Sequence, residues 1–169
     1  MSLVKTSIEN LSVNPFTLIG RDWYLITAGK SVSDYNTMTA SWGSLGVMWG
    51  KNVFTCGIRP NRHTFGFVED SEYFTMSFFD SDRYRDMLTF CGTKSGRDVD
   101  KAKETGITPT EIDGTVTFEE AKLVFVCRRM YAQDLDEKSF TDKSALKFYE
   151  KDPYHRMYTS EIVAVYENK

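Results

Sequence analysis

The stretch Asn36–Gly50, NTMTASWGSLGVMWG, says more about this chain than any other segment. It carries little charge, is rich in Thr, Ser and Gly, and contains Trp42 and Trp49. Small residues let a backbone come close to a flat ligand. The hydroxyl and amide groups of Thr39–Ser41 can meet the polar edge of a ring whose face is covered by an indole. The stretch therefore predicts one wall of a ligand site; the alternative is that both tryptophans belong to an ordinary core.

A first basic segment lies downstream at Arg59–Thr64 (RPNRHT), between a predicted strand and a predicted helix over Phe65–Glu69. Thr64 is a suitable N-cap for that helix, and the start of a helix favours an anion. Arg59 and Arg62 add planar guanidinium groups that can bind phosphate oxygens in pairs. The segment predicts a phosphate site, against the alternative of two surface arginines beside an ordinary cap.

A second basic segment, Lys94–Lys101 (KSGRDVDK), repeats this pattern. The sequence Ser95–Asp98 has the spacing of a capping box before a predicted helix over Asp98–Glu104, and Arg97 and Lys101 add positive charge. The alternative is a solvated, charged helix start. A flat polar ring with a phosphate tail describes flavin mononucleotide (FMN), which we predict as the cofactor. Neither segment matches a P-loop or a G-x-G-x-x-G pattern, so the site is not of the Rossmann type.

Length and charge limit the other classes of function. A chain of 169 residues is predicted to form a single domain over residues 1–169. The net charge of −3 gives no general attraction for nucleic acid or an anionic membrane. No apolar run approaches a membrane span, and no signal peptide pattern is present. Cys56, Cys91 and Cys127 are widely spaced, as expected of reduced thiols in a cytoplasmic protein. With two histidines, a His-rich metal centre is excluded, and we predict no metal.

Short apolar runs with the spacing of strands dominate the chain. The predicted strands are Phe16–Ile19, Trp23–Thr27, Asn52–Ile58, Tyr73–Phe79, Leu123–Cys127 and Met157–Tyr166. A hairpin turn at Gly20–Asp22 would join the first two. A helix is predicted between a cap at Ser81 and a stop at Gly92, and the charged region Asp134–Pro153 is interpreted as an excursion from the core. This pattern predicts a mainly β protein, a barrel or a sandwich, with a few short helices.

His155 lies just before the last predicted strand. A histidine with a pKa near neutrality could cover the flavin or stabilise charge on it. The alternative is a loop histidine without a special role. We assign no catalytic residue, because the sequence contains no nucleophile elbow.

The order of these motifs closely resembles the flavin reductase-like family, and in particular its flavoredoxin-type branch. The resemblance is carried by YNTMTASWG, a strand ending in RPxRxT, SFF, SGRDVDK and the late YHRMY, and it runs from Asn14 to Ile162. Two departures stand out. His63 takes a place where relatives often have an aromatic residue, and Gly66 loosens the helix start.

The resemblance implies a split β-barrel of the FMN-binding type, usually a homodimer that holds FMN non-covalently near the subunit interface. Carried over to this chain, it implies two groups of cofactor-binding residues. The isoalloxazine would be lined by Asn36, Thr37, Met38, Thr39, Ala40, Ser41 and Trp42. The phosphate side would be formed by Arg59, Arg62, Thr64, Ser95, Gly96, Arg97 and Lys101, the last four from the same chain or from the partner subunit.

Three functions follow from these expectations. The favoured one is a flavin reductase-type oxidoreductase that moves electrons from NADH or NADPH through the flavin. The second is an FMN electron carrier that passes electrons between redox partner proteins and has no nicotinamide site. The third is a barrel that binds single-stranded nucleic acid through aromatic and basic residues. The acidic net charge and the lack of a continuous basic stripe argue against the third.

Overall fold

The structure, a computed structural model, describes residues 2–169. Strands make up most of its regular structure: β1 (Leu3–Thr6), β2 (Tyr24–Ser31), β3 (Asp34–Ala40), β4 (Gly43–Met48), β5 (Lys51–Ile58), β6 (Tyr73–Phe78), β7 (Pro109–Ile112), β8 (Thr115–Phe118), β9 (Leu123–Asp134) and β10 (Arg156–Asn168). The helices are short: α1 (Pro15–Thr17), α2 (His63–Glu69), α3 (Ser81–Thr93) and α4 (Lys101–Thr105), with 3-10 or π turns η1 (Ile8–Asn10), η2 (Leu18–Asp22), η3 (Glu137–Ser139) and η4 (Lys143–Tyr149). The mainly β prediction is confirmed.

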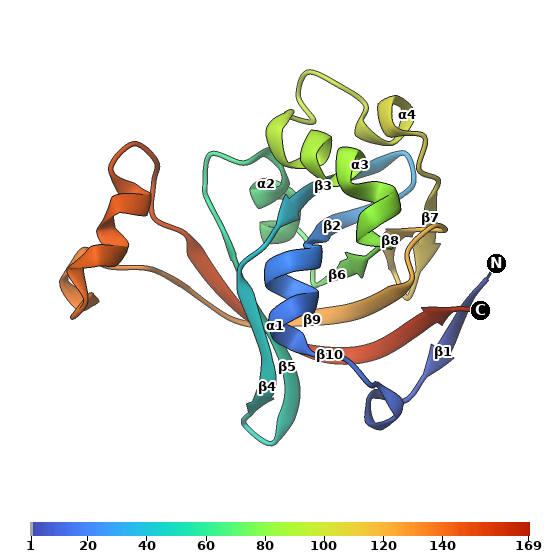
Figure 1. The fold of residues 1–169 in the computed structure, drawn as a ribbon, viewed down its shortest axis with the longest axis horizontal. Coiled ribbons are helices and arrows are strands. Elements are labelled where there is room, and N and C mark those ends of the chain that lie inside the picture. Colours follow the sequence, from blue (N-terminus) through green and yellow to red (C-terminus); the bar gives the residue numbers. More distant parts are fainter. Residues whose placement is uncertain (1) are drawn as a thin grey trace.

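One curved antiparallel sheet organises the molecule, in the order β3-β2-β6-β9-β10-β5-β4, with β1 added on β10. Register shifts at Thr159/Ser160 and Ile162/Ala164 interrupt the pairing of β10 with β9, and such bulges bend a sheet. The β7–β8 hairpin packs over β2 and β6. Strand β3 is therefore an edge strand, and helix α3 lies beside it (Figure 1).

Two cores lie on the two faces of this sheet, because successive side chains of a strand point to opposite sides. On β9, Phe125 and Cys127 belong to one core, while Val124 and Val126 belong to the other. The predicted strand Leu123–Cys127, buried on both faces, is thus confirmed. The predicted strands over residues 52–58, 73–79 and 157–166 are also confirmed as β5, β6 and most of β10.

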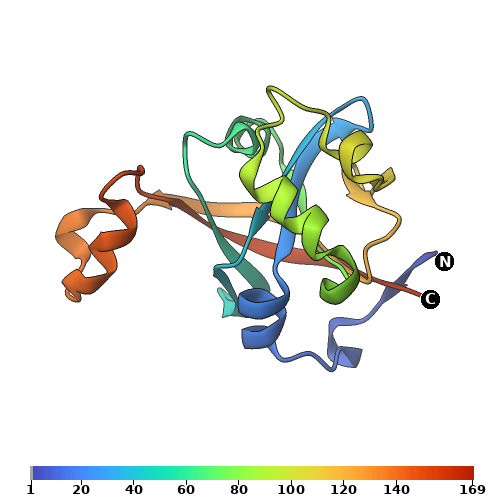
Figure 2. The same cartoon turned by 45° about the horizontal axis from the view of Figure 1, so that its top comes forward.

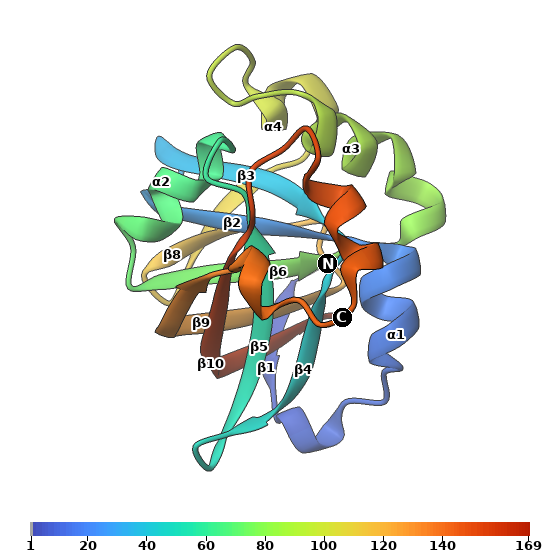
Figure 3. The same ribbon diagram turned by 90° about the vertical axis from the view of Figure 1, so that its left-hand side faces the viewer.

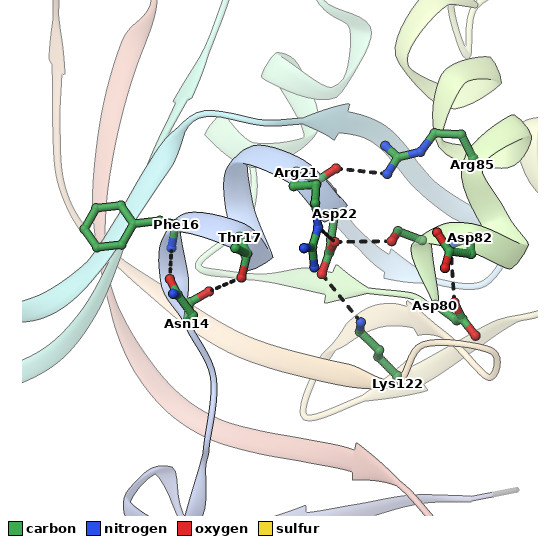
Figure 4. Close-up of polar contacts among 10 residues, drawn as sticks. Asn14, Phe16, Thr17, Arg21, Asp22, Asp80, Asp82, Arg85 and Lys122 are labelled. Carbon is green, nitrogen blue, oxygen red and sulfur yellow. Dashed lines mark hydrogen bonds and ion pairs between the residues drawn. The ribbon is translucent and has the colours of Figure 1, made fainter.

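The predicted hairpin over Phe16–Thr27 is wrong in its first half. Pro15–Thr17 is helical and Leu18–Asp22 is a π turn; the strand begins only at Tyr24. Asn14 caps the first turn by accepting a hydrogen bond from the amide of Phe16 at 3.0 Å (Figure 4). An asparagine cap followed by proline at the first helical position is a strong helix start, and it outweighs the apolar run after it.

The predicted helix starts need three corrections. Helix α2 begins at His63 with Arg62 as its N-cap residue, and Thr64 is not the cap. Helix α3 is capped by Asp80 and not by Ser81. Helix α4 begins at Lys101, where Asp100 accepts a hydrogen bond from the amide of Lys103. Aspartate side chains cap α3 and α4, whereas Arg62 precedes α2 without a side-chain cap.

Residues 135–155, which we call the arm, project from the ends of β9 and β10 (Figures 1 and 2). The arm carries η3 and η4, and neither turn has a buried residue. Seen along the long axis, the arm lies in front of the sheet (Figure 3). The prediction of an excursion in this region is confirmed. Within the described residues, no helix has the length and apolar character needed to cross a membrane.

Candidate functional site

A recess lies where β3 passes into β4, and we call it the ring cavity. Its volume is about 170 Å³, and its lining is formed by Met38, Thr39, Ala40, Ser41, Trp42, Gly57, Arg59, Arg62 and His155. All of these except Gly57 are predicted site residues. Because β3 is an edge strand, its outer backbone groups face the helices and loops instead of another strand. The structure therefore brings the Thr- and Ser-rich stretch, both arginines and His155 to one place.

Gly57 lets His155 approach the sheet. A Cβ atom at Gly57 would lie 2.9 Å from the sulfur of Met157 and 3.3 Å from the Cβ atom of His155. A side chain at position 57 would therefore push Met157 and His155 away from the sheet, and glycine leaves room for both. Sequence reasoning missed Gly57, because its role depends on a neighbour almost a hundred positions away.

His155 is held in an aromatic setting. Its Nδ1 lies 2.9 Å from the hydroxyl of Tyr149, and its ring lies 5.3 Å from the ring of Trp42. Burial, together with the charges of Arg59 and Arg62, lowers the pKa of His155 to about 4. The expectation of a pKa near neutrality is therefore wrong, and the imidazole is neutral at pH 7.

The two arginines of the first basic segment differ in their partners. Arg62 donates from Nη2 to the carbonyl of Gly92 at 3.2 Å, and burial followed by the charge of Arg59 lowers its pKa. Arg59 donates to the carbonyls of Pro153 at 2.9 Å and Phe148 at 3.0 Å, both in the arm. Arg62 therefore brings a partly buried charge without an acidic partner, while Arg59 is tied to its own chain.

Lys101 lies deep in the protein, with 5% of its surface exposed. Its ammonium group donates to the carbonyls of Thr37 at 2.7 Å and Cys91 at 2.8 Å. Burial is the main cause that lowers its pKa to about 8, and the charge of Arg62 acts in the same direction. None of the ion pairs among the described residues involves Lys101. A buried ammonium group that forms no ion pair has an electrostatic need that an anion can meet.

Asn36, on the edge strand β3, contacts both Thr64 and Gly96. The side-chain amide of Asn36 donates to Oγ1 of Thr64 at 2.7 Å. A Cβ atom at Gly96 would overlap the side-chain oxygen of Asn36, so this loop can pass only with glycine. Thr64 and Asn36 are buried and do not line the ring cavity. Ser95 uses its hydroxyl to accept from the amide of Arg97 at 3.2 Å, and it lines none of the cavities described here.

Two further cavities adjoin the first. A hollow of about 780 Å³, the loop cavity, lies between the β2–β3 turn and the 96–103 loop and includes Asn36, Thr37, Gly96, Arg97 and Lys101. A hollow of about 470 Å³, the helix cavity, runs along α2. Arg62 lines both the ring cavity and the helix cavity, and Arg97 lines both the helix cavity and the loop cavity. Every predicted site residue except Thr64 and Ser95 therefore lines either the ring cavity or the loop cavity. The helix cavity lies between these two, because it shares Arg62 with the first and Arg97 with the second.

The local field is positive despite the acidic chain. Burial is the main cause that lowers the pKa of His63, and the charges of Arg97 and Lys101 lower it further. Burial and the charges of Arg59 and Arg62 lower the pKa of His155 in the same way. Asp98 and Asp100 line only the loop cavity. Cations that disfavour one another's protonation favour an anion, so the residues present fit the phosphate of the predicted cofactor.

Comparisons with known proteins identify the family and the fold of the chain. Residues 17–169 match the family described as "Flavin reductase like domain". The comparison with curated proteins gave no match. An FMN-binding protein from Thermus thermophilus is similar in structure, with a TM-score of 0.67, 19% identity, and coverage of 97% of this chain and 81% of that chain.

Two further solved structures share the fold. The flavoredoxin of Desulfovibrio vulgaris (Miyazaki F) has a TM-score of 0.68 at 16% identity, and the match covers 98% of this chain and 78% of the flavoredoxin chain. The styrene monooxygenase flavin reductase of Pseudomonas putida S12 has a TM-score of 0.61 at 12% identity, with 85% and 77% covered. The split-barrel prediction is confirmed, and since both kinds of protein share the fold, the flavoredoxin-type branch stays a prediction. The family match spans most of the chain, and the chain belongs to the flavin reductase-like domain family.

Proposed function

We propose that this chain binds FMN non-covalently and works as a flavin reductase-type oxidoreductase that takes electrons from NADH or NADPH. The observation that carries the proposal is the ring cavity, where the backbone of β3 and Trp42 lie beside the partly buried charge of Arg62. The isoalloxazine would lie against Met38–Trp42, and the phosphate near Arg62, Arg97 and Lys101. Proteins named as FMN-binding and as flavin reductases share this fold.

The residues of the chain would divide the work between binding and orientation. FMN supplies hydride and electron transfer when it is bound. The small side chains of Thr39–Ser41 leave the backbone of β3 accessible to the polar edge of the ring. Trp42 offers the face of its indole, since 47% of the surface of this residue is exposed. Neutral His155 can accept or donate one hydrogen bond at the ring edge, because Tyr149 already occupies Nδ1.

The electron carrier remains the second candidate. Trp42, which lines the ring cavity, is itself exposed, so a flavin placed against it would keep an exposed edge for a redox partner protein. The similarity to a flavoredoxin is compatible with this function. The three buried free cysteines support a reducing, cytoplasmic location for either activity.

Anaerobic reduction separates the two functions. FMN bound to the protein should bleach when NADH or NADPH is added, at a rate that saturates with nicotinamide and exceeds that of free FMN. A reductase needs this transfer, whereas a carrier without a nicotinamide site does not. The measurement is stopped-flow absorbance of the flavin bands, with FMN alone as control. Bands that persist until dithionite is added would support the carrier and contradict the reductase.

We extend the proposal to a homodimer. Val47, Met48 and Trp49 at the tip of the β4–β5 hairpin are exposed, Val47 by 71%, and Trp49 meets the exposed ring of Tyr131 at 6.1 Å. An exposed apolar group of this kind is typical of an interface. The ring cavity of about 170 Å³ is also smaller than the roughly 300 Å³ at which ligand pockets begin. A second subunit that reaches the ring cavity would complete its wall.

Sedimentation tests the dimer directly. The wild-type protein is expected to sediment as a dimer, and Trp49→Glu should shift it towards the monomer because it places a charge in the apolar tip. Val13→Glu is the control. Val13 is also an exposed apolar residue, but it lies outside the β4–β5 hairpin, so this change should leave the dimer intact. A wild-type protein that sediments as a monomer, with or without FMN, would contradict this part of the proposal.

A further inference from the structure

The arm has few contacts with the rest of the molecule. Apart from the strand pairing at its base, the hydrogen bonds of the described residues that join it to the body both come from Arg59. The arm also contacts the body through the rings of Phe148 and His155, which lie 5.0 Å and 5.3 Å from that of Trp42. It further contacts the body through an ion pair of Asp152 with Arg59 at 4.0 Å, and where His155 packs at Gly57. An element with so few buried contacts has a low local stability. The arm is therefore held in place mainly by one guanidinium and one indole.

Arg59 is well suited to this role. Its two terminal nitrogens donate to carbonyls at both ends of the 148–153 segment, and the guanidinium lies 5.2 Å from the centre of the Tyr149 ring. The nearest carboxylate, that of Asp152, is 4.0 Å away. A planar fork can bridge two separate carbonyls in this way, whereas the ammonium group of lysine is a single point of charge. The interaction depends on the shape of the side chain as well as on its charge.

The arm also limits the ring cavity. Phe148 stands edge-on to Trp42 with an interplanar angle of 80°, and His155 forms part of the lining. With the arm in this position the cavity holds about 170 Å³, less than the roughly 300 Å³ at which ligand pockets begin. Movement of the arm away from Trp42 would remove His155 from the wall, take Phe148 off the indole and widen the opening.

We propose that Arg59 is a positioning residue that holds residues 135–155 closed over the ring cavity, and that the flavin enters and leaves when the arm releases from Arg59. The identity of the ligand rests on the proposed flavin site, but the closed position of the arm does not depend on that site. It gives Arg59 a different role from the sequence-based assignment, in which Arg59 binds the phosphate. The two roles predict different behaviour for ligands with and without a phosphate.

Proteolysis without flavin tests the closed arm. Chymotrypsin sites at Phe140, Phe148 and Tyr149 lie in the arm. Cleavage there should be about tenfold faster in Arg59→Gln and in Arg59→Lys than in the wild type, since cleavage follows the population of the locally open state. Arg85→Gln is the matched control, because Arg85 also donates to a backbone carbonyl, that of Arg21 (Figure 4), and lies over the ring of Trp23. Unchanged cleavage in both Arg59 variants would overturn the proposal.

Binding kinetics then separate the two roles of Arg59. Stopped-flow fluorescence with FMN and with riboflavin, which lacks the phosphate, should show faster association and dissociation of both ligands by the same factor in Arg59→Lys. If Arg59 bound the phosphate instead, Arg59→Gln would weaken FMN alone and leave riboflavin unchanged, and the proposal would be wrong. Arg59→Lys covers the case in which Arg59→Gln fails to fold. If the wild type binds neither ligand, the flavin site fails, and the cleavage rates still decide whether Arg59 holds the arm.

Discussion

Replacing Lys101 with methionine is expected to weaken FMN binding at pH 7 by about 10- to 100-fold, while the midpoint of thermal unfolding stays unchanged or rises. A hydrogen bond to a charged group contributes about 1.5–3 kcal/mol, which corresponds to this range of affinity. In the folded protein without an anion, however, the buried ammonium group of Lys101 has only the carbonyls of Thr37 and Cys91 as partners. Its removal therefore costs binding, while in folding the loss of these two hydrogen bonds is offset by the removal of a buried charge that has no ion-pair partner.

The pH dependence gives the same residue a second signature. The pKa of Lys101 is lowered from 10.5 to about 8, so between these values the unfolded chain holds a proton that the folded chain has released. The free energy of unfolding should therefore rise with pH from about 8 to 10.5, and this rise should be absent in Lys101→Met. FMN affinity of the wild type should fall as pH increases above about 8, because the anion needs the protonated form.

Titrations of FMN by flavin fluorescence and thermal unfolding at several pH values measure both effects. Lys5→Met is the control, since Lys5 is exposed on β1 and lines none of the three cavities. It should leave affinity and its pH dependence unchanged. If Lys101→Met binds FMN as the wild type does, Lys101 has no part in holding the phosphate.

Gly96→Ala is expected to destabilise the fold by about 1–3 kcal/mol, the usual cost of overpacking, and to weaken FMN binding. The added Cβ would overlap the side-chain oxygen of Asn36. Either the 96–103 loop moves away, which displaces Arg97 and Lys101, or Asn36 turns and loses its hydrogen bond to Thr64. Both outcomes disturb the groups expected around the phosphate.

A double-mutant cycle identifies the cause. In an Asn36→Ala background the oxygen that the new Cβ would meet is gone, so Gly96→Ala should cost much less there than in the wild type. Gly20→Ala is the control, because a Cβ at Gly20 would meet no atom within 4 Å. Denaturant unfolding measures all of these variants. Equal costs of Gly96→Ala in both backgrounds would show that the contact with Asn36 is not the reason.

Local chemistry explains which elements were predictable from sequence. The five apolar residues of Leu123–Cys127 and the alternation of β10 reflect burial of each strand, which short windows display. The failure at Phe16–Ile19 shows the limit of this reasoning. There the cap formed by Asn14 and Pro15 decides the conformation before the apolar run begins.

The site was predictable in its segments and not in its contacts. The small, polar composition of Thr39–Ser41 and the pairs of basic residues are visible in sequence. That Arg59 is tied to the arm is not, because its partners Phe148 and Pro153 are backbone carbonyls that any residue could supply. The low pKa of His155 depends in the same way on burial and on two arginines distant in the chain.

An FMN titration tests the central claim most directly. Purified protein freed of flavin should bind FMN saturably with one flavin per chain, and it should bind FMN more tightly than riboflavin, with the preference reduced in Arg62→Met and Lys101→Met. Quenching of flavin fluorescence and the change in its visible bands report this binding. Absence of saturable FMN binding, or equal affinity for FMN and riboflavin in the wild type, would contradict a site that holds the ring at β3 and the phosphate near Arg62 and Lys101.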